Sequence, residues 1–183
     1  MPPSPIIRSA ISQFRRYKGL AESAVAQIPE PALFEVLDEE SNSIAMLLKH
    51  LAGNLLSRWT NFLTSDGDKP DRDRDAEFLT DPSDTKEKLL AHWEAGWGCA
   101  FAALEALRPE DLERTVTIRG EPCTVLEAIH RNLTHTAYHV GQIVLLAKHS
   151  ARSQWQTLSI PRGKSKEATT APGRPGARSY WKR

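Results

Sequence analysis

The sequence of 183 residues has little cysteine and no long hydrophobic run. Its two cysteines, Cys99 and Cys123, exclude a small protein held together by several disulfides and fit a reducing cytosol in which both remain thiols. No segment approaches the roughly 18 consecutive apolar residues of a membrane-spanning helix. The start, Met1-Pro2-Pro3-Ser4-Pro5, lacks the basic residues and apolar stretch of a secretion signal. We therefore expect a soluble, cytoplasmic protein with no membrane partner.

A large excess of charge of one sign is also absent, because 24 basic residues face 23 acidic ones. The distribution is uneven, since residues 153–183 carry seven basic residues and one acidic residue, which gives this tail +6 and residues 1–152 a charge of −5. Beyond Ala168 the tail offers little apolar surface to offset the entropy of ordering. We expect one domain over residues 1–152 and a basic, partly disordered tail over 153–183. The acidic body argues against a nucleic-acid partner.

The sequence does contain four segments whose apolar residues recur with a period close to 3.6, which is typical of amphipathic helices. The clearest places Trp93 and Trp97 on one apolar face as core anchors. Ser43 is a good N-cap for the second segment, and Thr124 with Glu127 forms a capping box for the fourth. These signals predict helices near residues 5–28, 42–64, 83–107 and 124–149.

Between the last two segments, residues 113–123 alternate polar and apolar side chains around Gly120, a pattern that favours a small β-hairpin or an extended connector. Four helices of roughly 20 residues, with one longer connection between the second and third, are typical of an antiparallel four-helix bundle. We therefore predict an all-α fold with a short extended or β connector before the fourth helix.

The fourth predicted helix carries two histidines, His135 and His139, one turn apart on the same face. Ala128, Asn132 and Gln142 project to the same side, which directs both imidazoles inward. A buried polar group without a partner costs about 1–3 kcal/mol, and a divalent cation would satisfy both rings. Two surface histidines, or core histidines bonded to backbone carbonyls, are the alternative interpretation of this spacing.

A reactive zinc site takes three protein ligands and leaves a position for water or substrate, so a third ligand must come from another helix. His50 is the only histidine of the second predicted helix, but it lies well away from the apolar stripe that contains Leu47 and Leu55. Periodicity alone therefore places His50 at the rim of the core. His130 lies on another face and His149 at the helix C-terminus, so neither needs a metal.

A wider pattern connects these histidines. Lys49-His50-Leu51-Ala52-Gly53-Asn54 is followed by Arg58-Trp59, by Glu77-Phe78, by His135-x-x-x-His139-x-Gly-Gln-Ile and by Leu158-Ser159-Ile160-Pro161-Arg162-Gly163. The combination resembles the DinB-like superfamily of metal-dependent bundle proteins, in particular one uncharacterised branch. The similarity covers about residues 5–166, and departures such as Asp71 lie in the loop and the tail.

The resemblance implies a three-histidine site made by His50, His135 and His139, usually holding zinc or nickel, and commonly a homodimer. A tryptophan count of five gives the dimer some support, because aromatic residues are favoured in interface cores. We expect imidazole nitrogens at roughly 2.0–2.1 Å from one ion, with at least one position left to water. Because members of the superfamily include S-transferases that use low-molecular-weight thiols, the leading expectation is transfer of a small thiol to a small electrophile.

The candidates for binding substrate are Asn54, Arg58, Asn132 and Gln142. Arg58 could hold a carboxylate, although a structural salt bridge with Asp66 or Asp75 is the favoured interpretation. Gln142 could equally bond a backbone carbonyl. Two other functions remain open from the sequence: a metal-dependent hydrolase, and a binding or stress protein in which the metal only stabilises the fold.

Overall fold

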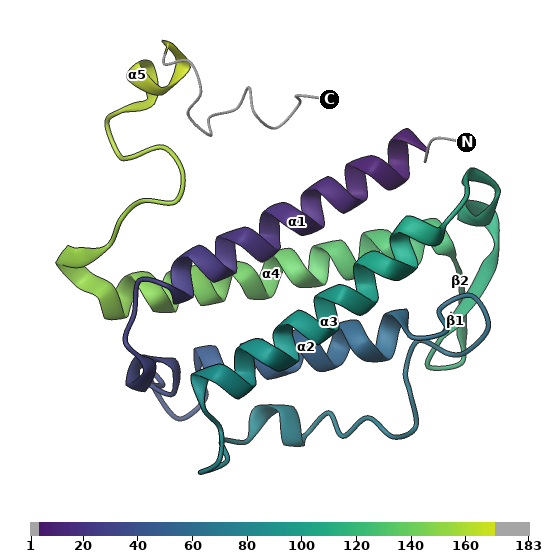
Figure 1. The fold of residues 1–183 in the computed structure, drawn as a ribbon, viewed down its shortest axis with the longest axis horizontal. Coiled ribbons are helices and arrows are strands. Elements are labelled where there is room, and N and C mark those ends of the chain that lie inside the picture. The colour runs from purple at the N-terminus through teal and green to yellow at the C-terminus, as the bar shows by residue number, and fades with distance from the viewer. Residues whose placement is uncertain (1–3, 171–183) are drawn as a thin grey trace.

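The computed structural model describes residues 4–170 and is mostly helical (Figure 1). The long helices are α1 (Pro5–Val25), α2 (Ile44–Trp59), α3 (Lys86–Ala106) and α4 (Val125–Ala151). A small antiparallel sheet of β1 (Thr115–Ile118) and β2 (Glu121–Thr124) precedes α4, and a short helix α5 (Ser165–Thr170) follows it. The turns η1 (Glu30–Leu33), η2 (Ala76–Phe78), η3 (Pro109–Glu113) and η4 (Arg152–Gln154) lie in the connections. The predicted helical fold and the β connector are both confirmed.

Side-chain caps determine where the helices begin. The Ser43 hydroxyl accepts a hydrogen bond from the Met46 N–H, and the Thr124 hydroxyl accepts one from the Glu127 N–H. Because the Glu127 carboxylate also accepts from the Thr124 N–H, the predicted capping box is present. The end of α2 was predicted near residue 64, but the helix ends at Trp59 because the following backbone becomes extended and then left-handed.

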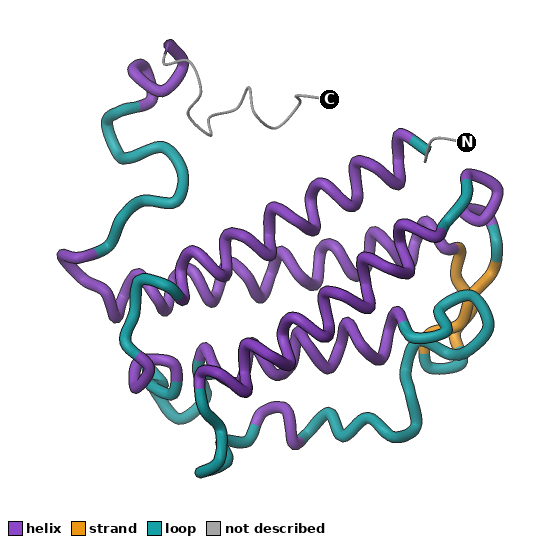
Figure 2. Tube along the Cα trace, in the orientation of Figure 1, coloured by secondary structure: helices purple, strands orange, loops and turns teal. Residues whose placement is uncertain are grey.

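The four long helices run in two pairs. Figure 1 shows α1 and α4 running in one direction and α2 and α3 in the other. The contacts agree: Lys49 near the start of α2 bonds Asp84 just before α3, and Thr60 just after α2 lies 3.5 Å from Cys99 in the second half of α3. Because α2 and α3 are parallel neighbours, the helix directions do not alternate along the chain. The predicted antiparallel bundle requires such alternation. Residues 60–85 return along the length of α2 to make this possible (Figure 2).

The core lies between the two helix pairs and is mostly aliphatic, with a cluster of aromatic rings inside it. Phe14 of α1 packs edge-on against Trp59, with ring centres 6.3 Å apart, and against Trp97, at 6.0 Å. Trp93 and Trp97 are both buried, as their periodicity predicts. With Trp59, Trp93 and Trp97 inside the protomer, these tryptophans cannot supply the dimer interface that their number suggested.

The first residues after α4 pack against the helical body of the protein. Trp155 and Leu158 pack against the core, and the Gln27 side chain bonds the backbone of Gln156 through both its amide oxygen and its amide nitrogen. From there the chain leads away from the long helices to α5 (Figure 1). The end expected to be loose is the segment beyond Ala168, and most of that segment, including Tyr180 and Trp181, lies outside the described residues.

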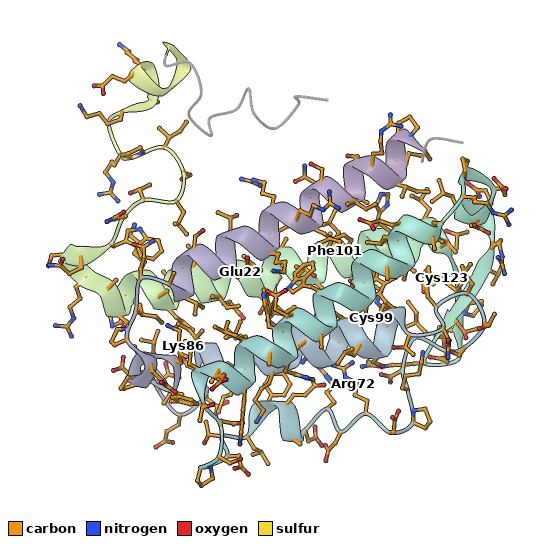
Figure 3. The ribbon with its side chains drawn as sticks, in the orientation of Figure 1. Glu22, Arg72, Lys86, Cys99, Phe101 and Cys123 are labelled. Atoms are coloured by element: carbon orange, nitrogen blue, oxygen red, sulfur yellow. The ribbon has the colours of Figure 1, made fainter. Side chains whose placement is uncertain are left out.

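Both cysteines are free thiols, Cys99 on α3 and Cys123 on β2, and Figure 3 shows them well apart. Within residues 4–170, no helix combines the length and the apolar character required to traverse a lipid bilayer.

Candidate metal centre

Three histidines from two helices converge beside the loop of residues 60–85. Ligand atoms of His50 on α2 and of His135 and His139 on α4 all lie within 4.8 Å of one another. The Nε2 atoms of His50 and His135 are 3.1 Å apart. The three side chains named from the sequence are therefore neighbours, and the described residues add no further histidine, cysteine or carboxylate to the group.

His50 is only 2% exposed, so its predicted rim position is wrong. In an amphipathic surface helix, the side of α2 opposite the leucine stripe would face water. The loop of residues 60–85 instead covers that side, with the Phe78 ring 4.7 Å from the His50 ring and the Glu77 carboxylate bonded to it. Helix α2 is thus buried on two sides, which an amphipathic pattern does not reveal.

Hydrogen bonds orient two of the imidazoles. His50 Nδ1 lies 2.8 Å from Glu77 Oε2, and His139 Nδ1 lies 3.0 Å from Gln142 Oε1. Both oxygens are acceptors, so each Nδ1 carries the hydrogen and donates it. The Nε2 atom of each ring then keeps its lone pair, which is the tautomer that metal-binding histidines adopt when a second group holds the opposite nitrogen.

The histidines of α4 are held in their neutral form. Burial, together with the neighbouring His139 and His50, lowers the pKa of His135 to about 3. Burial also lowers the pKa of His139, although its bond to Gln142 acts in the opposite direction. Neutral imidazole is the form that binds metal ions, so neither ring has to lose a proton near neutral pH.

The donor set fits a divalent metal ion. Two nitrogens bound to one ion at roughly 2.0–2.1 Å with tetrahedral angles lie about 3.3 Å apart, close to the observed separation of the His50 and His135 Nε2 atoms. His135 Nδ1 is buried without a hydrogen-bond partner among the described residues, so another imidazole is the main polar contact of this ring. A shared cation would satisfy the lone pairs that these rings direct at one another.

A cavity of about 200 Å³ adjoins the histidines and is lined by His50, His135, Asn54, Arg58 and Asn132 among others. Three of the four side chains predicted to bind substrate therefore line it. The fourth, Gln142, bonds His139 instead.

Asn132 is held rigidly at the wall of this cavity. Its Oδ1 accepts a hydrogen bond of 2.9 Å from the Trp59 indole N–H, and its Nδ2 donates one of 2.8 Å to Asn54 Oδ1. The chain of three side chains links α2 to α4 directly beside the histidines, so it fixes the spacing of the two helices at the site.

Arg58 does not form the predicted salt bridge. In the described part of the chain it has no carboxylate partner, and its Nη1 atom is buried without any hydrogen bond. Asp66, one of the two expected partners, accepts hydrogen bonds from the backbone N–H groups of Arg119 and Gly120 instead. The guanidinium is therefore buried and lacks a counter-ion in contact.

Sequence reasoning missed Glu77 and Arg72 as site residues. Arg72 donates two hydrogen bonds to the Glu77 carboxylate, Nε to Oε1 at 2.7 Å and Nη2 to Oε2 at 2.8 Å. Figure 3 places Arg72 between its loop and α2. Burial alone would raise the pKa of Glu77, but bonds to His50 and Arg72 lower it overall, so the carboxylate stays ionised. One signal was available: a glycine inside a helix, Gly53, where an added Cβ would collide with Glu77 Oε1.

Comparison with known proteins identifies the family. A family model described as "Protein of unknown function (DUF1572)" matches residues 4–164, which covers all four long helices and the hairpin. Neither the curated proteins nor the solved structures contain a match.

Proposed function

The chain belongs to the DUF1572 family of proteins of unknown function, and we propose that it is a metal-dependent enzyme that transfers a small thiol to a small electrophile. The observation that carries the proposal is the cluster of His50, His135 and His139, whose rings meet at one point beside an open cavity. Zinc or nickel is the proposed ion, because imidazole suits both.

The same proposal includes a DinB-like four-helix bundle. Its support is the pairing of α1 with α4 and of α2 with α3, together with the position of the histidines on facing helices, α2 and α4. Metal sites of helical bundles are commonly built in this way, from inward side chains on facing helices.

Three protein ligands favour a reactive site over a purely structural one. Structural zinc sites are closed by four protein ligands, whereas catalytic sites use three and keep a position for water or substrate. The described residues contribute three histidines, and two of them, His50 and His135, line the cavity. A small molecule in the cavity would therefore reach the remaining position.

His50, His135 and His139 would hold a divalent ion, which would supply a nucleophile at neutral pH by lowering the pKa of a bound thiol or water. The protein orients the ligands: Glu77 holds the Nδ1 hydrogen of His50, and Gln142 holds that of His139. In the transfer, the sulfur forms a bond to an electrophilic carbon, the leaving group departs with the electron pair of its broken bond, and the thiol proton goes to solvent. Asn54 and Arg58 are placed to orient the electrophile.

A cobalt-substituted sample tests this function directly. Addition of a small thiol such as cysteine should change the visible spectrum of the bound cobalt, and a chromogenic electrophile should then be consumed only when thiol is present. His139→Ala is the matched variant that should lose both effects, and exposed His130→Ala should keep them. A spectrum that thiols leave unchanged would contradict the proposal in favour of a closed, stabilising metal, and turnover without thiol would favour a hydrolase.

A further inference from the structure

The cavity beside the histidines is unusually rich in arginine. Five of the nine residues that line it are arginines, contributed by α2, by the loop of residues 60–85, by the turn of the hairpin and by α4. They are Arg58, Arg72, Arg74, Arg119 and Arg131. The remaining lining side chains are asparagine and histidine, so no carboxylate lines the cavity.

Nearby carboxylates neutralise only part of this charge. Glu77 pairs with Arg72, and Asp68 lies 3.0 Å from Arg119 Nε and 3.8 Å from Arg72. Arg74 and Arg131 form no ion pair with described residues. Five guanidinium groups therefore face two carboxylates, and one of these, Glu77, is also bonded to His50.

Arg58 is the centre of this arrangement. It is 7% exposed, and its Nη1 atom has no hydrogen-bond partner among the described residues. Within residues 4–170, the charges that surround it are those of Arg131, Arg72 and Arg119, against the single carboxylate of Asp68, which forms no ion pair with it. A buried guanidinium without a counter-ion is costly, because it gives up hydration and receives no charge-assisted hydrogen bond in return. An anion in the adjacent cavity, which Arg58 lines, would offset part of this cost through its charge.

The backbone makes room for the guanidinium at this position. A Cβ atom added at Gly67 would lie 2.7 Å from Arg58 Nη1, so only glycine lets the loop after α2 approach the side chain this closely. Gly67 is tied to α2 and to the hairpin, because its carbonyl accepts from the Ser57 hydroxyl and its N–H donates to the Thr117 carbonyl. The loop thus holds Arg58 at the cavity wall in a fixed position.

We propose that the arginine-lined cavity binds an oxyanion, the carboxylate or phosphate group of the small molecule on which the protein acts. This rests on the proposed function in one respect, since the anionic group would anchor a substrate whose other end reaches His50 and His135. A volume of about 200 Å³ suits a small acid or a phosphorylated fragment. Guanidinium groups bind such oxyanions through paired N–H donors, which gives both orientation and affinity.

Calorimetric titration with inorganic phosphate and with malonate, in buffer of low chloride concentration, tests the proposal. We expect saturable binding of at least one of the two in the millimolar range. Arg58→Gln should weaken it about tenfold or more, since it removes a buried charged donor. Arg131→Gln, an exposed change that leaves the core intact, should weaken it several-fold, and Gly67→Ala should weaken it by displacing Arg58.

Arg15→Gln is the matched control, because Arg15 is an exposed arginine of α1 that pairs with Glu105 and does not line the cavity. It should leave anion binding unchanged. The proposal is overturned if neither anion binds, or if Arg15→Gln weakens binding as much as Arg131→Gln does.

His139→Ala separates this proposal from the metal site. His139 does not line the cavity, so a variant that has lost its metal should still bind the anion. Retained binding in His139→Ala supports the arginine cavity even if no thiol transfer is ever observed. Binding that disappears in His139→Ala and persists in Arg58→Gln and Arg131→Gln would place the anion on the metal and overturn the proposal.

Discussion

At the scale of single residues, Glu77 joins the histidine cluster to the arginine-lined cavity. Its carboxylate accepts a hydrogen bond from His50 Nδ1 and one each from Nε and Nη2 of Arg72. Glu77 is only 8% exposed. Glu77→Gln should lower the affinity for metal roughly tenfold, as is usual when a group behind a ligating histidine is lost. It should also lower the free energy of unfolding by about 2–3 kcal/mol, because Arg72 keeps its buried charge and loses a charged acceptor.

Chelator competition measures the affinity of the Glu77→Gln variant, and urea denaturation measures its stability. Glu113→Gln, an exposed glutamate before the hairpin, is the control and should change neither quantity. Equal metal affinity in wild type and Glu77→Gln would show that Glu77 does not orient His50.

Gly53 gives an independent test of the same carboxylate. Alanine in a helix interior normally adds about 1 kcal/mol of stability over glycine, but at this position the Cβ would collide with Glu77 Oε1. Gly53→Ala should therefore displace Glu77 and weaken metal binding without touching a ligand. Gly141→Ala is the control on the ligand helix, where a Cβ meets nothing within 4 Å. Chelator competition should show weaker binding in Gly53→Ala only; the opposite ranking would contradict the account.

The residues of the site differ in how far sequence could find them. His135 and His139 follow from helical spacing alone, since i and i+4 always share a face. His50 required the resemblance, because its burial depends on a loop whose path periodicity does not predict. Gly53 inside a helix indicated a close contact on this side of α2, but not that Glu77 makes it. Arg72 and the arginines from the hairpin and α4 could not be found, since they converge only through the tertiary fold and several other charged residues of the loop were equally plausible partners.

At the scale of elements, the close approach of α2 and α3 depends on Gly96. A Cβ there would lie 2.9 Å from the Ala52 carbonyl oxygen and 3.0 Å from its Cα. Because backbone cannot move aside as a flexible side chain can, Gly96→Ala should separate the helices and cost about 1–3 kcal/mol. Gly98→Ala, two residues further along α3 and on the opposite side of the helix, meets nothing and should stabilise by about 0.5–1 kcal/mol. Thermal unfolding of the two variants measures this difference: the melting temperature should fall in Gly96→Ala and rise in Gly98→Ala. A shift of the same sign in both variants would contradict the prediction.

Asp66 attaches the hairpin to the end of α2 and makes stability depend on pH. Burial would raise its pKa, but hydrogen bonds from the backbone N–H groups of Gly120, Asp68 and Arg119 lower it to about 2. A carboxyl whose pKa is lower in the folded state stabilises the fold above its ordinary pKa of 3.8, and this contribution is lost as the pH falls toward 2.

Asp66→Asn should therefore reduce the free energy of unfolding by about 1–2 kcal/mol at pH 7, the value of hydrogen bonds to a charged acceptor at a partly exposed position. Urea denaturation should show this difference shrinking between pH 4 and pH 2, by roughly the range that the lowered pKa defines. A difference that stays constant over that range would mean that the Asp66 charge is not what holds the turn.

The elements themselves were well predicted because their signals are local. Apolar periodicity located the four long helices, and the capping residues Ser43 and Thr124 located two of their starts. The parallel course of α2 and α3 was not predictable, because helix direction depends on how residues 60–85 cross the molecule and not on any local pattern. The early end of α2 depends on the left-handed backbone at Asn61, with φ of 48°, which no strong turn signal marks.

At the scale of the whole molecule, two helix pairs, a covering loop and a hairpin enclose one polar site within an apolar core. The homodimer remains a prediction. The aromatic and aliphatic side chains available for it on α4 are Tyr138 and Leu145, which are 65% and 64% exposed and lie two turns apart on one face.

The central claim is that His50, His135 and His139 hold one divalent ion. Elemental analysis of protein purified without a histidine tag, after dialysis against zinc or nickel, tests it most directly. Wild type and the exposed variants His130→Ala and His149→Ala should each carry about one ion per chain, while His50→Ala, His135→Ala and His139→Ala should lose tightly bound metal, because two imidazoles hold a labile ion poorly. The account is contradicted if wild type carries no metal, or if the exposed variants lose it as readily as the three ligand variants.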